Sequence, residues 1–217
     1  MTFYTVFEFL RDLQKNNSKD WMDENRQRYH ECRDFVIDWA NETMVKIGKV
    51  DPEFKATPGK KALSRINNNL MYHPEKPVYK DHFGVEMNLS GGPSGFYVQL
   101  GLSHNFVGGG IWETSKDQIE KMRAAIDYDG EKLKEILSSK KFRNIFGELT
   151  RDSALKTSPK NYDKEHVHID LLRLKRYACQ VSTTQDEITS DDFQDKLVEY
   201  YKILVPLGRY INRAVNY

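Results

Sequence analysis

The chain has 217 residues, of which 39% are hydrophobic and 30% are charged, a composition typical of a folded domain with a core of its own. Its 33 Lys and Arg residues are balanced by 32 Asp and Glu residues, which excludes a basic field over the whole molecule, so we do not expect a nucleic-acid partner. No apolar run is long enough to span a bilayer, so we expect a protein that binds no membrane. The only cysteines, Cys32 and Cys179, lie far apart in the chain, which fits a reducing compartment, so we expect a cytoplasmic protein.

The N-terminal part, roughly residues 5–48, is predicted to be helical. Apolar residues recur at helical spacing from Thr5 to Lys15, and charged residues interrupt them, which is not typical of a signal peptide. The segment Asn16–Ser18 is expected to end this helix and to cap a second, longer one that ends at Gly48.

The middle part, residues 60–111, is predicted to be rich in strands. The segment Leu63–Tyr72 looks extended, with a bulge or a tight turn at its three asparagines. Apolar residues then alternate in Tyr79–Leu89 and again from Phe96, and the turn Ser90–Gly95 between these runs indicates a β-hairpin. A third extended piece is expected to end at Gly108–Gly110.

The C-terminal part, residues 112–217, is predicted to contain helices and one strand. Ser115 and Gln118 form a capping-box pattern at the start of a helix, and Asp129 is placed to cap another. After a polar loop we expect a short helix over residues 163–171, then a strand over Leu172–Thr183 with a bulge, because the parity of its apolar residues changes near Lys175. A last helix begins near residue 189, and Pro206 should kink it.

These elements together indicate the α+β class. The runs between the strands are too short for regular βαβ crossovers, so the sheet should be mostly antiparallel. We expect a single domain, residues 1–217, in which N- and C-terminal helices pack on this sheet.

Four segments resemble, in order and spacing, those of the DUF2461 family of conserved proteins: NNSKDWMDENRQRYH (16–30), SRINNNLMYHPEKPVYK (64–80), VGGGIWET (107–114) and YDKEHVHIDLLRLKRY (162–177). The resemblance covers most of the chain and implies a shared fold, but no particular reaction. In the second segment six residues match the family pattern, while three depart from its Arg, Asp and Arg. The matching residues are Arg65, Ile66, Asn67, Lys76, Tyr79 and Lys80, and the departures are Asn68, Asn69 and Met71.

The same segment has the residue types of an anion site. Arg65 can supply a bidentate fork, Lys76 and Lys80 supply point charges, and Asn67 supplies neutral hydrogen bonds. Tyr79 can stack on a base or a sugar ring. The alternative is that these lysines protect a sheet edge from pairing with other chains.

Three further features are expected to converge on this site. A turn at Gly108, Gly109 and Gly110 would let the backbone approach an anion near the start of the next helix. Trp112 would line the pocket, and Arg173, on a strand face with Lys175, would add charge. The alternatives are a plain turn that needs positive φ, a tryptophan in the core and a solvated basic face.

His166 and His168 are weak candidates for catalysis. On a strand both would face one side, and Glu165 or Asp170 could orient an imidazole that carries a proton. Because no Cys or carboxylate spacing supports a metal, we expect none.

The sequence therefore predicts a pocket for a phosphorylated or otherwise anionic small molecule, with hydrolase or transferase chemistry left open. The alternative is a non-enzymatic protein-interaction module with no small-molecule site. Neither a cofactor nor a protein partner can be inferred from the residues.

Overall fold

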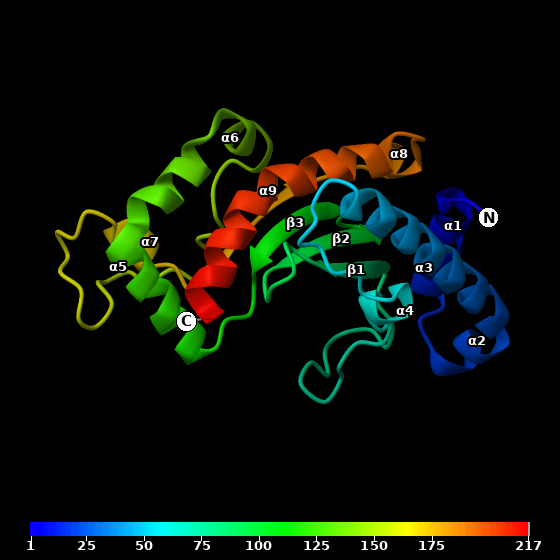
Figure 1. The fold of residues 1–217 in the computed structure, drawn as a ribbon. Coiled ribbons are helices and arrows are strands. Elements are labelled where there is room, and N and C mark those ends of the chain that lie inside the picture. Colours follow the sequence, from blue (N-terminus) through cyan, green and yellow to red (C-terminus); the bar gives the residue numbers. More distant parts are fainter. Residues whose placement is uncertain (217) are drawn as a thin grey trace.

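Four antiparallel strands form the centre of the molecule in the computed structural model, which describes residues 1–216 (Figure 1). They lie side by side in the order of the sequence: β1 (His82–Asn88), β2 (Gly95–Gly101), β3 (Phe106–Ile111) and β4 (Tyr177–Ser182). A turn joins β1 to β2 and another joins β2 to β3, whereas the helical segment 112–176 separates β3 from β4. The sheet is therefore a meander with a helical insertion before its last strand.

One face of the sheet is apolar and covered. A row of four valines crosses it, because the register pairs Val85 with Val98, Val98 with Val107, and Val107 with Val181. The first three are fully buried, and β-branched neighbours of this kind pack well on a pleated surface. The strand residues between them point to the opposite face, where Glu86 is exposed and Tyr97 and Gln99 are half-buried.

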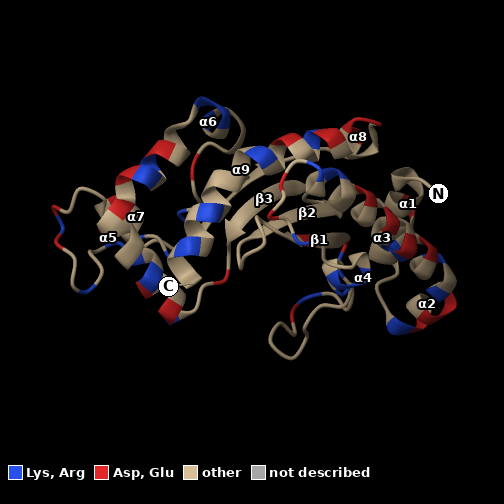
Figure 2. Ribbon diagram, viewed as in Figure 1, with Lys and Arg blue, Asp and Glu red and all other residues tan. Residues whose placement is uncertain are grey.

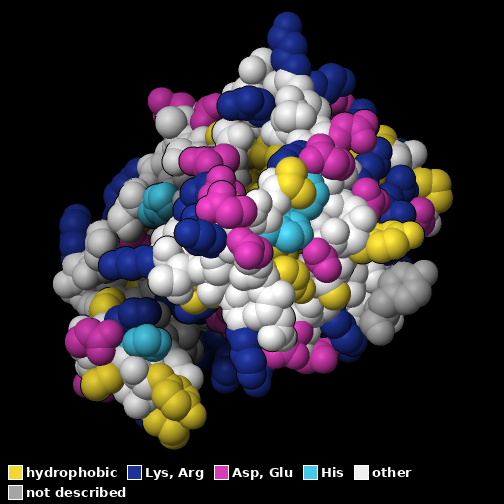
Figure 3. All heavy atoms as spheres, turned by 90° about the vertical axis from the view of Figure 1, so that its left-hand side faces the viewer, with side chains coloured by type: hydrophobic (Ala, Val, Ile, Leu, Met, Phe, Trp, Pro, Cys, Tyr) yellow, Lys and Arg dark blue, Asp and Glu magenta, His cyan; other side chains and the backbone are white. Residues whose placement is uncertain are grey.

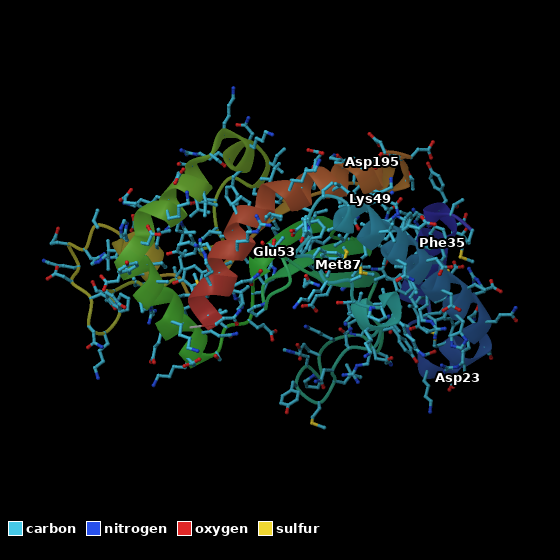
Figure 4. All side chains as sticks on the ribbon, viewed as in Figure 1. Asp23, Phe35, Lys49, Glu53, Met87 and Asp195 are labelled. Atoms are coloured by element: carbon cyan, nitrogen blue, oxygen red, sulfur yellow. The ribbon has the colours of Figure 1, made fainter. Side chains whose placement is uncertain are left out.

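Two long helices cover the apolar face, α3 (Arg26–Gly48) and α9 (Phe193–Asn216) (Figure 1). Helix α9 lies against β3, where the missing side chain of Gly109 leaves room for Leu204. The two helices are braced by an ion pair of 2.6 Å between Lys46 and Asp195, and Figure 4 shows Asp195 near the end of α3 at Lys49.

The remaining helices surround this core. Helix α1 packs on α3, and α5 packs on α9. Their bounds, with those of the short helices, are α1 (Phe3–Lys15), α2 (Lys19–Glu24), α4 (Gly59–Ala62), α5 (Lys116–Ser138), α6 (Lys140–Phe146), α7 (Ile169–Leu172) and α8 (Gln185–Thr189). No helix within residues 1–216 combines the length and the apolar character that crossing a bilayer requires.

A buried carboxylate joins three distant segments of the fold. Asp51, after α3, accepts hydrogen bonds of 2.8 Å from the Ser90 and Tyr201 hydroxyls. Arg209 of α9 lies 3.2 Å from Asp51 and 3.2 Å from Glu53, which Figure 4 labels. Burial alone would raise the pKa of Asp51, but the hydrogen bonds from Tyr201 and Ser90 outweigh it and lower the pKa.

The predicted α+β fold with an antiparallel sheet packed by N- and C-terminal helices is confirmed. So is the capping box, in which Ser115 accepts a bond from the Gln118 backbone and the Gln118 side chain returns one. The single long helix before Gly48 is wrong, because Asn25 has non-helical dihedral angles and separates α2 from α3.

The predicted strand over Leu172–Thr183 is also wrong in its first half. Leu172 ends helix α7 and Leu174 lies in the following turn, so β4 begins only at Tyr177. The change of parity near Lys175 reflects a change from helix to strand and not a bulge. Arg173 and Lys175 therefore do not share a strand face.

Candidate functional site

Residues 65–80, here called the basic hairpin, form a short irregular hairpin beside the outer edge of β1. Leu63 pairs with Val85 of β1, and after it the chain turns away and pairs with itself. The Lys80 N–H donates to the Ile66 carbonyl at 2.8 Å, and the Asn68 N–H donates to the Val78 carbonyl at 2.9 Å. Figure 1 shows this hairpin projecting below the sheet, next to α4.

The hairpin is anchored to the N-terminal helices through Asn17. The Asn17 side-chain amide donates to the Tyr79 carbonyl at 3.0 Å and accepts from the Tyr79 N–H at 2.9 Å. The Tyr79 side chain is only 5% exposed and belongs to the core. Its predicted role in stacking on a ligand is therefore not available to it, and its role is to hold the hairpin in place.

The hairpin carries three cations, Arg65, Lys76 and Lys80, whose charges act on one another. The Lys80 ammonium donates to the Arg65 carbonyl at 2.7 Å, and Lys80 is half-buried. Burial, followed by the positive charges of Arg65 and Lys76, lowers the pKa of Lys80. Among residues 1–216, none of the three has a carboxylate within 4 Å. Figure 2 shows basic residues of α4 and of the adjacent segment below β1.

A second polar cluster, Asp81, His82 and Ser103, directly follows Lys80. The Asp81 carboxylate lies 3.0 Å from His82 Nδ1, and its other oxygen accepts a hydrogen bond from the Ser103 hydroxyl. Burial would raise the pKa of Asp81, but these hydrogen bonds lower it overall. The sequence reasoning did not find this cluster, although Asp81 and His82 stand side by side, because Ser103 comes from the turn after β2.

The three glycines lie within β3 and do not form the predicted turn. Gly108, Gly109 and Gly110 pair with residues of β2 on one side and of β4 on the other. Their backbone groups therefore take part in the sheet ladder and cannot cradle an anion. Gly110 alone has a positive φ, of 118°.

Trp112 and Gly110 line a hollow of about 470 Å³ on the uncovered face of the sheet, here called the open-face hollow. The Trp112 ring lies over Gly108. The centroid of the Phe106 ring lies 6.4 Å from the centroid of the Trp112 ring and 5.4 Å from that of the Tyr97 ring. The full lining is Glu86, Pro93, Gly95, Tyr97, Gln99, Phe106, Gly110, Ile111, Trp112 and Glu113. No Lys or Arg is among these residues, so the hollow and the basic hairpin are separate sites.

The comparison with protein families decides which family this fold represents. Residues 5–210 match the family model described as "Conserved hypothetical protein (DUF2461)". The chain belongs to the DUF2461 family. Comparisons with curated proteins and with solved structures found no match.

Arg173 does not join the basic hairpin in this DUF2461 protein. It follows α7, which packs on α5, and its guanidinium lies 3.6 Å from Asp170. Its Nε atom is buried and has no hydrogen-bond acceptor within residues 1–216. The predicted contribution of Arg173 to the anion site fails because α7 and the hairpin lie on different sides of the sheet's centre (Figure 1).

The two candidate histidines of the DUF2461 chain, His166 and His168, lie in turns before α7 and not on a strand. His166 Nε2 is 2.9 Å from Asp127 of α5, so Asp127, and not Glu165 or Asp170, orients this imidazole. His168 is 6% exposed, and burial, followed by the charge of Lys134, lowers its pKa. No group of three or more metal-ligating side chains is present in residues 1–216.

Proposed function

We propose that this DUF2461 protein binds a phosphorylated or otherwise anionic small molecule at the base of the basic hairpin. The observation that supports the proposal is the cluster of Arg65, Lys76 and Lys80, which has no carboxylate partner among residues 1–216. Unpaired like charges close together raise one another's energy, and the charges of Arg65 and Lys76 add to the effect of burial in lowering the pKa of Lys80. An anion between them would remove this repulsion.

The residue types favour a phosphate group. The guanidinium of Arg65 offers two parallel N–H donors to phosphate oxygens. The ammonium groups of Lys76 and Lys80 are point charges on flexible side chains, so they can approach a phosphate from several directions. Asn67 is exposed beside them and its side chain makes no hydrogen bond within the described part of the chain, so it is free to donate. Asn68 differs, because its amide already donates to the Pro77 carbonyl at 2.8 Å.

The neighbouring Asp81–His82 pair supports an extension of the proposal to hydrolase or transferase chemistry. An imidazole oriented by a carboxylate can accept or deliver a proton during group transfer. His82 is in this position, with Asp81 on its Nδ1 atom. We propose His82 as the residue that would carry the proton if a reaction follows binding.

Calorimetric titration of pyrophosphate and nucleotides, at fixed ionic strength, tests the binding proposal. We expect Arg65→Ala to weaken binding by about tenfold or more, since it removes a charged bidentate contact. Arg143→Ala is the matched control, because Arg143 is an exposed arginine of α6 without an ion pair among residues 1–216. Equal affinities of the two variants for every anion would refute the proposal.

The tip of the hairpin favours protein interaction as a second candidate function. Leu70, Met71 and Tyr72 are 36%, 84% and 74% exposed, and the tip forms the lobe at the lower edge of Figure 3. Exposed apolar residues of this kind mark interaction sites when they are contiguous. A photo-crosslinking residue at position 71 should capture a partner that the same residue at exposed Tyr4 does not. Identical crosslinking patterns at both positions would exclude a docking role for the tip.

A further inference from the structure

Two carboxylates of the open-face hollow have no partner of their own. Glu86 and Glu113 both line the hollow, and within residues 1–216 neither side-chain carboxylate accepts a hydrogen bond or has a cation within 4 Å. Lys61 lines a smaller adjoining hollow together with Glu86, but the two do not form an ion pair. The charge that faces the open-face hollow is therefore negative.

Three aromatic side chains also line the open-face hollow. Tyr97, Phe106 and Trp112 are each half-buried, so part of every ring faces solvent. Their spacing, 5.4 Å between the first two centroids and 6.4 Å between the last two, makes a continuous aromatic surface. The Trp112 ring is held against Gly108, where a Cβ would come within 3.1 Å of it. The surface is thus fixed by the backbone beneath it.

Neutral acceptors complete the hollow. The Gln99 amide nitrogen donates to the His104 carbonyl at 2.8 Å, which leaves its carbonyl oxygen as a free acceptor. Tyr97 keeps its proton, because burial and then the charge of Glu86 raise its pKa to about 12. A ligand that fits this lining must carry positive charge and an apolar body, since carboxylates repel anions and aromatic faces attract cations.

We propose that the open-face hollow binds a small organic cation with an ammonium group. The ammonium lies against the Trp112 and Phe106 rings and pairs with Glu86 and Glu113. A volume of about 470 Å³ is within the range of small-molecule pockets. This site is independent of the basic hairpin, because it uses other residues and the opposite sign of charge.

Choline and its uncharged isostere 3,3-dimethylbutanol are the probes that test this proposal. We expect choline to give a saturable change in tryptophan fluorescence that the isostere does not give, and Trp112→Phe should abolish the change although Trp21 and Trp39 remain. Glu86→Gln and Glu113→Gln should each weaken choline binding about five- to tenfold, since each removes one attraction to the ammonium.

Glu42→Gln is the matched control, because Glu42 is an exposed glutamate on α3, over the covered face of the sheet, without an ion pair in the described chain. Circular dichroism would establish that each variant folds; Glu86 and Glu113 are exposed, so their amides should not disturb the core. The proposal is overturned if choline gives no saturable response, if the isostere binds equally well, or if the Glu86 and Glu113 variants bind choline as the Glu42 variant does.

Discussion

At the scale of single residues, Gly110 illustrates how the backbone shapes the open-face hollow. Its φ of 118° is a conformation that residues with a side chain rarely adopt. A Cβ at this position would also collide with the Tyr177 carbonyl of β4. Gly110 therefore permits the close pairing of β3 with β4 beside the hollow that it lines.

Gly110→Ala should lower the free energy of unfolding by about 3 kcal/mol, because unfavourable dihedral angles and a steric clash add up. Gly147→Ala is the matched control. Gly147 also has a positive φ, of 71°, but a Cβ there would meet nothing within 4 Å, so only a conformational cost of about 1–3 kcal/mol applies and its loss should be the smaller of the two. Urea unfolding measures both values, and equal losses would show that the clash with Tyr177 is not real.

At the scale of elements, the basic hairpin depends on one distant side chain. Asn17 makes two hydrogen bonds to the backbone of Tyr79, 62 residues away in the chain. These bonds fix the strand of the hairpin that carries Lys80. Without them, the base of the hairpin would open more often, and its three cations would spend less time together.

Asn17→Ala should make the hairpin about tenfold more sensitive to trypsin at Arg65 and Lys80, since losing these bonds costs about 1.4 kcal/mol or more of local stability. Asn16→Ala is the matched control, because the Asn16 side chain donates only to the Asp12 carbonyl in its own helix, at 2.9 Å. Mass spectrometry of the first cleavage products identifies the sites. If both variants are cut at the wild-type rate, Asn17 does not anchor the hairpin.

The elements that the sequence predicts correctly are those with local signals. The capping box at Ser115 and the alternation in β1 and β2 involve residues only a few positions apart. The strand position of Gly108–Gly110 was missed for a different reason. Glycines usually mark turns, but here Leu204 from α9 and the Cys179 carbonyl from β4 occupy the space that side chains would need.

At the scale of the whole molecule, two carboxylates hold separate elements of the fold together. Asp51 joins the end of α3, the β1–β2 turn and α9. Glu187 of α8 pairs with Lys196 of α9 and accepts from the Thr184 N–H, and these contacts lower its pKa to about 2. Both groups are more acidic in the folded protein than in the unfolded chain.

Stability should therefore fall in acid. A lowered pKa contributes stability above the unfolded value, about 4 for a carboxyl group, and this contribution is lost as the pH falls toward the folded pKa. Asp51→Asn should cost about 2–3 kcal/mol at neutral pH and make the decline below about pH 4.5 shallower. Denaturant unfolding at several pH values checks this, with exposed Asp191→Asn as control. Parallel pH profiles for both variants would contradict it.

The candidate site was predictable only in part, because the sequence indicates local turns more clearly than the positions of distant segments. Arg65 and Lys80 meet because the chain between them folds back on itself, and the prolines and asparagines of that segment indicate such a turn. Whether a distant segment joins them depends on strand order. Strand β2 lies between β1 and the glycines of β3, so these glycines are separated from the hairpin beside β1. The turn at Ser90–Gly95 predicts the pairing of β1 with β2, but the glycines were assigned to a turn and not to a third strand of the sheet.

The most direct test of the anion site is a titration with pyrophosphate followed by the backbone amide signals of the isotopically labelled protein. Sodium chloride at equal ionic strength serves as the reference, since general screening acts on all exposed charges. We predict saturable shifts at residues 65–68 and 78–80 and none at Gly108–Gly110. Shifts that sodium chloride reproduces, or that gather on β3 while the hairpin is unchanged, would contradict the account.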